Sequence, residues 1–119
     1  MGLKELTEQY VSSFNNKDLK HIETMLCGDG CTLVDPENVF SGKNAVLNEV
    51  SRIFQFNTLK FVAQNIYTLE TENTSVIEFD IQLDDLYLQG IDIIEWQDNK
   101  IFAIRAYVNE AKDKEIRFV

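Results

Sequence analysis

Residues 75–96 read SVIEFDIQLDDLYLQGIDIIEW, and this stretch contains two consecutive segments in which apolar and polar side chains alternate. Such alternation is typical of β-strands with one buried face, because successive side chains of a strand point to opposite sides. We predict strands within 75–84 and 86–96, joined by a turn at Asp84-Asp85. Together they would form an antiparallel hairpin with one wet face and one dry face.

The alternation continues on both sides of this hairpin. Further strands are expected near 58–69 and 101–108, with turns at 70–74 and 97–100. The second half of the chain is therefore predicted to be an antiparallel meander of four strands.

Before residue 57 the apolar residues recur every three or four positions, which predicts three amphipathic helices. The first is expected to stop at Asn15-Asn16, while Asp18 caps the second helix and Ser41 caps the third. The apolar positions are Leu3, Leu6, Tyr10, Val11 and Phe14; Leu19, Ile22, Met25 and Leu26; and Val46, Leu47, Val50, Ile53 and Phe54. Helices followed by a meander indicate an α+β fold, in which a curved antiparallel sheet wraps around three N-terminal helices.

The composition is that of one soluble domain spanning residues 1–119, with 109–119 as a mobile or docking tail. Eleven basic residues against 20 acidic ones give a net charge of −9, and no Lys/Arg cluster is present. Nucleic acid and anionic membranes are therefore not expected as partners. No apolar run approaches the ~18 residues of a membrane span and no signal peptide is visible, so we expect a cytoplasmic protein.

Cys27, Cys31 and His21 do not suggest a metal site, because these ligands cannot complete a tetrahedral zinc set. We expect the two cysteines to be small buried side chains, with a redox pair as the alternative. His21 is expected to lie in solvent on the outer face of the second helix.

Asp92 is the exceptional residue of the 86–96 strand, because it shares a face with Leu88 and Ile94. An ionised carboxylate on a core face is costly unless it is paired, and burial raises its pKa toward the neutral acid, which is a hydrogen-bond donor. The alternative is an ion pair, since a two-residue turn at Asp98-Asn99 would place Arg105 opposite Asp92. Against this, the apolar alternation at 102–108 favours the core, and placing it beside Asp92 requires an odd-numbered loop or a bulge, after which Arg105 points outward.

Asp35 and Tyr10 are two further polar residues, and each has an ordinary structural interpretation. A short extended segment from Thr32 ends at Asp35, which Pro36 excludes from helical conformation, and an Asp-Pro pair is usually a solvated turn. Tyr10 lies on the apolar stripe of the first helix, where a tyrosine is usually a core residue with its hydroxyl at the rim.

Four runs of the sequence resemble the bacterial ketosteroid isomerases, which belong to the NTF2-like and SnoaL-like superfamily. The runs are QYVSSFNNKDL at 9–19, LVDP at 33–36, SGKNAV at 41–46 and IDII at 91–94. The resemblance implies an NTF2-like (cystatin-like) cone that opens at one end to an apolar pocket. It also implies that Tyr10 and Asp92 donate hydrogen bonds to a substrate carbonyl oxygen, that Asp35 is the base, and that no cofactor or metal is required.

The resemblance has one departure, because Val50 stands where some of these isomerases carry a tyrosine that supports the catalytic one. Three functions remain open: an isomerase acting on an apolar β,γ-unsaturated ketone, a SnoaL-like polyketide cyclase, and a non-catalytic module that binds a small apolar ligand or a partner. A pocket filled by Trp96 or Phe54 would favour the last of these.

A homodimer is also expected, from family habit and from the apolar residues Tyr87, Ile91 and Ile93 on the outer face of the sheet.

Overall fold

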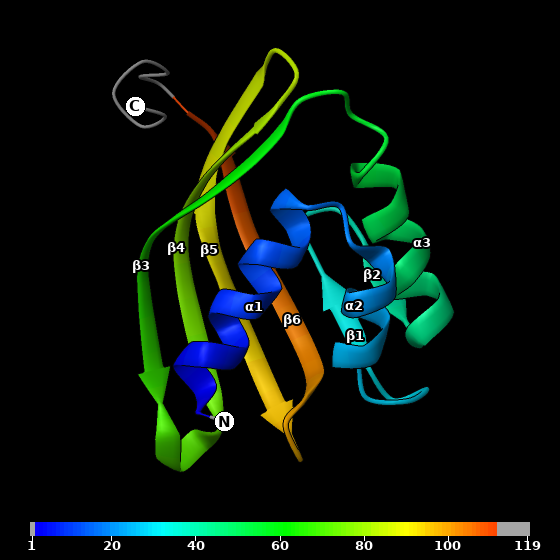
Figure 1. Ribbon diagram of the computed structural model, residues 1–119, viewed down its shortest axis with the longest axis vertical. Coiled ribbons are helices and arrows are strands. Elements are labelled where there is room, and N and C mark those ends of the chain that lie inside the picture. Colours follow the sequence, from blue (N-terminus) through cyan, green and yellow to red (C-terminus); the bar gives the residue numbers. More distant parts are fainter. Residues whose placement is uncertain (1, 112–119) are drawn as a thin grey trace.

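The computed structural model describes residues 2–111, and Figure 1 shows the arrangement of their elements. The helices are α1 (Leu3–Asn15), α2 (Leu19–Met25) and α3 (Lys43–Ile53), with a short 3-10 helix, η1 (Glu70–Glu72). The strands are β1 (Thr32–Val34), β2 (Val39–Ser41), β3 (Leu59–Leu69), β4 (Thr74–Leu83), β5 (Leu86–Gln97) and β6 (Lys100–Glu110). The predicted α+β class, a curved sheet around three helices, is confirmed.

All six strands form one open sheet in the order β2-β1-β6-β5-β4-β3, and the helices lie on one side of it (Figure 1). Strands β3 to β6 are the predicted antiparallel meander. The expected extended segment is β1, which runs parallel to β6 and pairs Val34 with Arg105. Strand β2 was not predicted, and it folds back on β1 as an antiparallel partner.

Of the two predicted helix caps, the one on α2 is confirmed and the one on α3 is wrong. Asp18 caps α2, because its carboxylate accepts the backbone N–H of His21 at 3.0 Å. The prediction that Ser41 caps α3 is wrong: Ser41 ends β2, where it pairs with Thr32, and Gly42 is the capping residue. The chain leaves the strand through a φ of +91° at Gly42, a conformation that a glycine adopts without strain.

Helix α1 is fastened to the sheet by hydrogen bonds as well as by its apolar face. The side-chain amide of Asn15 donates to the carbonyl oxygen of Phe61 on β3 and accepts its N–H, both at 2.8 Å. At the other end, the hydroxyls of Thr7 and Ser75 are 2.8 Å apart, and the indole N–H of Trp96 donates to Ser75 at 2.9 Å. These bonds fix the height and direction of α1 across the sheet.

A β-bulge decides which face Arg105 occupies. The turn at Asp98-Asn99 has positive φ at both residues, as in a two-residue hairpin, but the pairing shifts by one residue between Glu95 and Trp96. Asp92 is consequently paired with Ala106, and Arg105 forms an ion pair with Glu95 on the outer face. The alternative Asp92–Arg105 ion pair is therefore excluded.

Three smaller predictions concern the two cysteines, His21 and the C-terminal tail. Cys31 is buried and Cys27 is half-buried, and both are free thiols. His21 is half-buried, with its Nδ1 at 2.6 Å from the Ser13 hydroxyl, so the prediction of a solvated side chain is wrong. Residues 109 and 110 belong to β6, whereas 112–119 of the predicted tail lie outside the described residues.

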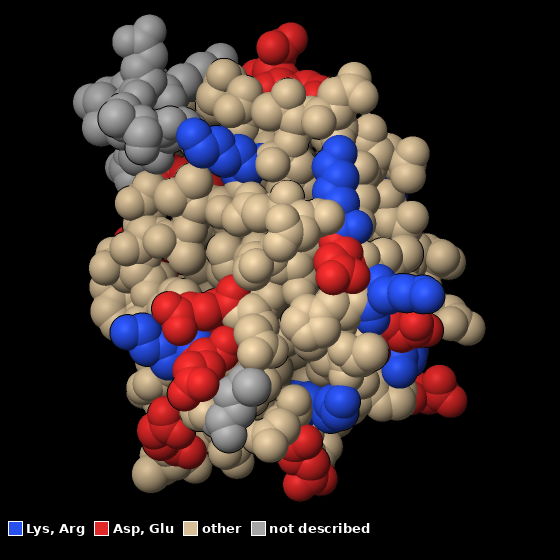
Figure 2. Space-filling model, in the orientation of Figure 1, with Lys and Arg blue, Asp and Glu red and all other residues tan. Residues whose placement is uncertain are grey.

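The surface of the molecule mixes both charges. On the face shown in Figure 2, Lys and Arg side chains are scattered among Asp and Glu. On the outer face of the sheet, the paired residues Ile91 and Tyr107 are 39% and 57% exposed, and association of two copies there stays a prediction. None of the helices within residues 2–111 is long and apolar enough to cross a membrane.

Strands β5 and β6 approach each other closely at Gly90 on β5. A Cβ atom added there would overlap the carbonyl oxygen of Tyr107 and lie 3.0 Å from Cα of Val108. Because these are backbone atoms of β6, no side-chain movement can make room.

We expect Gly90→Ala to lower the free energy of unfolding by about 1–3 kcal/mol, since the extra methyl group forces the two strands apart. Urea unfolding followed by circular dichroism measures the loss. Gly28→Ala is the matched control, because a Cβ there meets nothing within 4 Å and the cost should stay within about 0.5 kcal/mol. Equal stability of the two variants would contradict the prediction.

Candidate functional site

A cavity of about 380 Å³ lies between α1, α3, the concave face of the sheet and the turn that joins β1 to β2. Most of its walls are aliphatic or aromatic: Phe14, Leu33, Pro36, Val50, Ile53, Phe61, Phe79, Ile81, Leu83, Leu88, Ile104, Ala106 and Val108. Neither Trp96, which is bonded to Ser75, nor Phe54 is among the lining residues. The interior is therefore not filled by these two rings.

The polar lining includes all three residues that the sequence analysis singled out, Tyr10, Asp35 and Asp92. They come from α1, from the β1–β2 turn and from β5, which are far apart in the sequence. The fold thus brings them to one cavity, while their chemical roles stay predictions.

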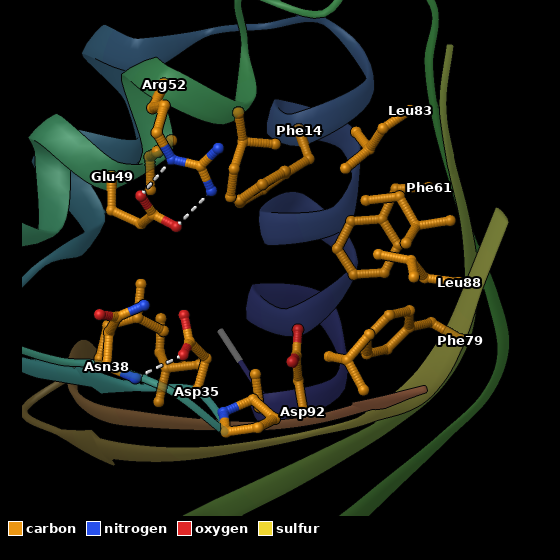
Figure 3. Close-up of a pocket in the computed structure, with 18 of the residues that line it drawn as sticks. Phe14, Asp35, Asn38, Glu49, Arg52, Phe61, Phe79, Leu83, Leu88 and Asp92 are labelled. Atoms are coloured by element: carbon orange, nitrogen blue, oxygen red, sulfur yellow. Dashed lines mark hydrogen bonds and ion pairs between the residues drawn. The ribbon is translucent and has the colours of Figure 1, made fainter. Parts of the chain in front are cut away.

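Asp92 is a buried acid that lines this cavity. Its residue is only 6% exposed, on the face of β5 that carries the buried Ile94, and Figure 3 shows its carboxyl group directed into the open space. None of the described residues forms a hydrogen bond or ion pair with this group, and burial raises its pKa from 3.8 to about 7. Below about pH 7 Asp92 is consequently a neutral acid with a hydrogen to donate.

Tyr10 is held by aromatic packing. Its ring centroid lies 5.0 Å from that of Phe14 and 6.4 Å from that of Phe61, and the residue is 3% exposed. Burial, together with the charge of Asp92, raises the pKa of the Tyr10 hydroxyl well above its ordinary value. The hydroxyl therefore stays protonated, and it lies close enough to Asp92 for an electrostatic interaction between the two groups. Val50 is buried and lines the cavity without offering a hydroxyl partner.

Asp35 is oriented by the turn in which it lies. Its Oδ1 accepts the backbone N–H groups of Glu37 at 2.9 Å and Asn38 at 2.8 Å, and its own N–H donates to the Asn38 carbonyl oxygen at 3.0 Å. Such an Asx turn fixes the side chain, as Figure 3 shows for Asp35 and Asn38. Asp35 is half-buried, and its second carboxylate oxygen is left to face the cavity.

An ion pair that was not predicted from the sequence lies at the opposite side of the cavity. Arg52 donates to both carboxylate oxygens of Glu49, from Nε at 2.7 Å and from Nη2 at 2.8 Å (Figure 3). The pKa of Arg52 is raised mainly by these hydrogen bonds and less by the charge of Asp35. A signal was present in the sequence, because Glu49 interrupts the apolar stripe formed by Val46, Val50 and Ile53.

The cavity lining offers two groups with a hydrogen to donate, the Tyr10 hydroxyl and neutral Asp92, and one carboxylate, that of Asp35, which can accept a proton. Within residues 2–111, no group of three or more His, Cys, Asp and Glu side chains is placed to hold a metal ion.

No protein-family model matches the sequence, and no curated protein matches it. Solved structures do share its architecture. An NTF2-like protein of unknown function from Cytophaga hutchinsonii superimposes with a TM-score of 0.80 at 13% identity, covering 92% of this chain and 91% of that one. A proposed ketosteroid isomerase from Kribbella flavida has a TM-score of 0.79 at 13% identity, covering 93% and 80% of the two chains.

A third similar structure is a proposed SnoaL-like polyketide cyclase from Shewanella putrefaciens, with a TM-score of 0.77 at 11% identity and coverage of 91% and 90%. At these identities the similarity shows the fold and not the activity. The chain therefore has the NTF2-like fold, and the resemblance seen in the sequence is confirmed at that level.

The raised pKa of Asp92 predicts how stability depends on pH. Between pH 3.8 and about 7 the folded protein keeps a proton that the unfolded chain releases. The stability contributed by neutral Asp92 is therefore complete below pH 3.8 and is lost as the pH rises through about 7. The whole loss is on the order of 4 kcal/mol.

Asp92→Asn has no such proton, so its free energy of unfolding relative to wild type should rise by about 3 kcal/mol between pH 5 and pH 9. Urea unfolding of both proteins at the two pH values measures this difference, and the contributions of the other carboxylates cancel in it. Parallel pH curves for the two proteins would show that Asp92 ionises normally.

Proposed function

We propose that this protein catalyses a cofactor-independent proton transfer on a small, apolar β,γ-unsaturated ketone, passing through a dienolate. The observation that carries the proposal is the convergence of Tyr10, Asp35 and Asp92 on one largely apolar cavity. Similarity to a proposed ketosteroid isomerase supports the same choice at the level of fold.

In the proposed reaction, the ligand carbonyl oxygen accepts hydrogen bonds from Tyr10 and from the neutral carboxyl group of Asp92. The Asp35 carboxylate removes a proton from the α carbon, and the electron pair of that C–H bond moves toward the oxygen. The negative charge of the dienolate then meets two donors in a largely apolar cavity, where hydrogen bonds are stronger than in water. Asp35 returns the proton to the γ carbon, which gives the conjugated ketone.

The burial of Asp92 favours this role over a purely structural one. A buried carboxyl group without a protein partner among residues 2–111 destabilises the fold, and such groups are usually satisfied by a ligand or by water. The Asx turn at Asp35 has a corresponding use, because it occupies one carboxylate oxygen and leaves the other for the substrate.

A phenol titration tests the proposed oxyanion site, because a bound phenolate imitates the dienolate. Wild type should bind 2-naphthol and a phenolic steroid at pH 6, as followed by their fluorescence. Asp92→Asn should weaken binding about 10- to 100-fold, since an amide donates a weaker hydrogen bond than a carboxylic acid.

Asp35→Asn is the control for this titration. It removes a negative charge from the cavity wall, so phenolate binding should be kept or strengthened. Failure of wild type to bind any phenol would remove the central element of the proposal.

Turnover is tested separately with a β,γ-unsaturated ketosteroid, because its conjugated product absorbs in the ultraviolet. We expect Asp35→Asn to lower kcat about 10²- to 10⁴-fold, the usual contribution of a positioned general base. Tyr10→Phe should lower kcat while leaving the base in place. Phenol binding without turnover of any such ketone would favour the alternatives, a ligand-binding module or a SnoaL-like cyclase.

A further inference from the structure

The cavity has a second polar region that the proposed proton transfer does not use. Glu49 and Arg52 lie on α3, across the open space from Asp92, and the side chains of Phe61, Phe79 and Leu88 line the apolar wall beside that space (Figure 3). A ligand that reaches from Asp92 to α3 therefore meets polar groups at both of its ends.

Arg52 is held in place but keeps donors to spare. Its bidentate ion pair with Glu49 uses two of the five N–H groups of the guanidinium, at 2.7 and 2.8 Å. The Glu49 side chain is 9% exposed and the Arg52 side chain is 64% exposed. A buried carboxylate therefore holds a guanidinium group that remains accessible to a ligand. Positioned donors at the edge of an apolar cavity are suited to selecting one orientation of a ligand.

The charges around Arg52 restrict what it can bind. Glu49 already neutralises the guanidinium, and Asp35 adds a further negative charge on the wall of the same cavity. A ligand carboxylate would meet net repulsion there, and an ammonium group would face the N–H donors of Arg52. An uncharged acceptor, such as a carbonyl or hydroxyl oxygen, fits both conditions.

We propose that Arg52, anchored by Glu49, is a specificity-determining residue that binds an uncharged oxygen at the far end of the ligand. The substrate class is then a bifunctional apolar molecule, with its reacting ketone at Tyr10 and Asp92 and a second carbonyl or hydroxyl group at α3. This inference rests on the proposed function for the position of the reacting end.

Three naphthols with one ring system test the inference by titration: 2-naphthol, 6-acetyl-2-naphthol and 6-hydroxy-2-naphthoate. In wild type the acetyl compound should bind about 10-fold more tightly than 2-naphthol, and the carboxylate more weakly. The acetyl group also makes the phenol more acidic, so the deciding quantity is the affinity ratio of these two compounds in wild type compared with Arg52→Met. That ratio should fall about 10-fold in the variant.

Two further variants act as controls. Lys43→Met removes a positive charge from the same helix outside the cavity lining, and it should leave the ratio unchanged. Glu49→Gln removes the carboxylate that neutralises Arg52, so 6-hydroxy-2-naphthoate should become the preferred ligand. Thermal unfolding of each variant shows whether it is folded, and Arg52→Met alone decides the question if Glu49→Gln does not fold.

The outcomes separate the two proposals. Binding of 2-naphthol that depends on Asp92, with the same affinity ratio in wild type and Arg52→Met, would overturn the role of Arg52 and leave the proposed function intact. Absence of any naphthol binding to wild type would overturn both. A fall in the ratio with Arg52→Met and not with Lys43→Met supports the inference.

Discussion

The curvature of the sheet is the constraint on which the rest of the structure depends. A flat sheet of six strands would meet α1 along a single line, whereas the curved sheet surrounds the helix on its concave side. Two register shifts, between Ala63 and Asn65 and between Glu95 and Trp96, produce local bends, as β-bulges do. Because the strands wrap around α1, side chains from opposite parts of the sheet face one interior space.

The same curvature leaves an unfilled cavity between the helices and the concave face of the sheet. Trp96, the largest side chain of β5, is held at the start of α1 through Ser75, away from the polar residues. The Asn15 bonds hold the other end of α1 against β3. With the helix fixed at both ends, it cannot settle into the space beside Asp92, and that acid remains buried and unpaired among the described residues.

Most of the fold could be predicted from local patterns, and the failures have a common physical cause. Alternation located the four long strands and placed Asp92 on the buried face, because side-chain direction in a strand depends only on sequence position. The parallel pairing of β1 with β6 could not be predicted, since it joins residues 32–34 to 103–105 through tertiary packing alone. Ser41 was misassigned because it belongs to the short strand β2, whose pairing with β1 places Ser41 opposite Thr32.

The candidate site could likewise be predicted only in part. Tyr10, Asp35 and Asp92 were selected through a family resemblance, to which the strand pattern added only the orientation of Asp92. Glu49 and Arg52 were missed because an i, i+3 ion pair on a helix usually lies on the surface, and only the helix position shows that this one borders a cavity. The connectivity has a further consequence for folding. Among residues 2–111, the hairpin that carries Asp35 pairs with the rest of the sheet through β6, so the Asp35 side of the cavity forms only when residues 100–110 are available for pairing.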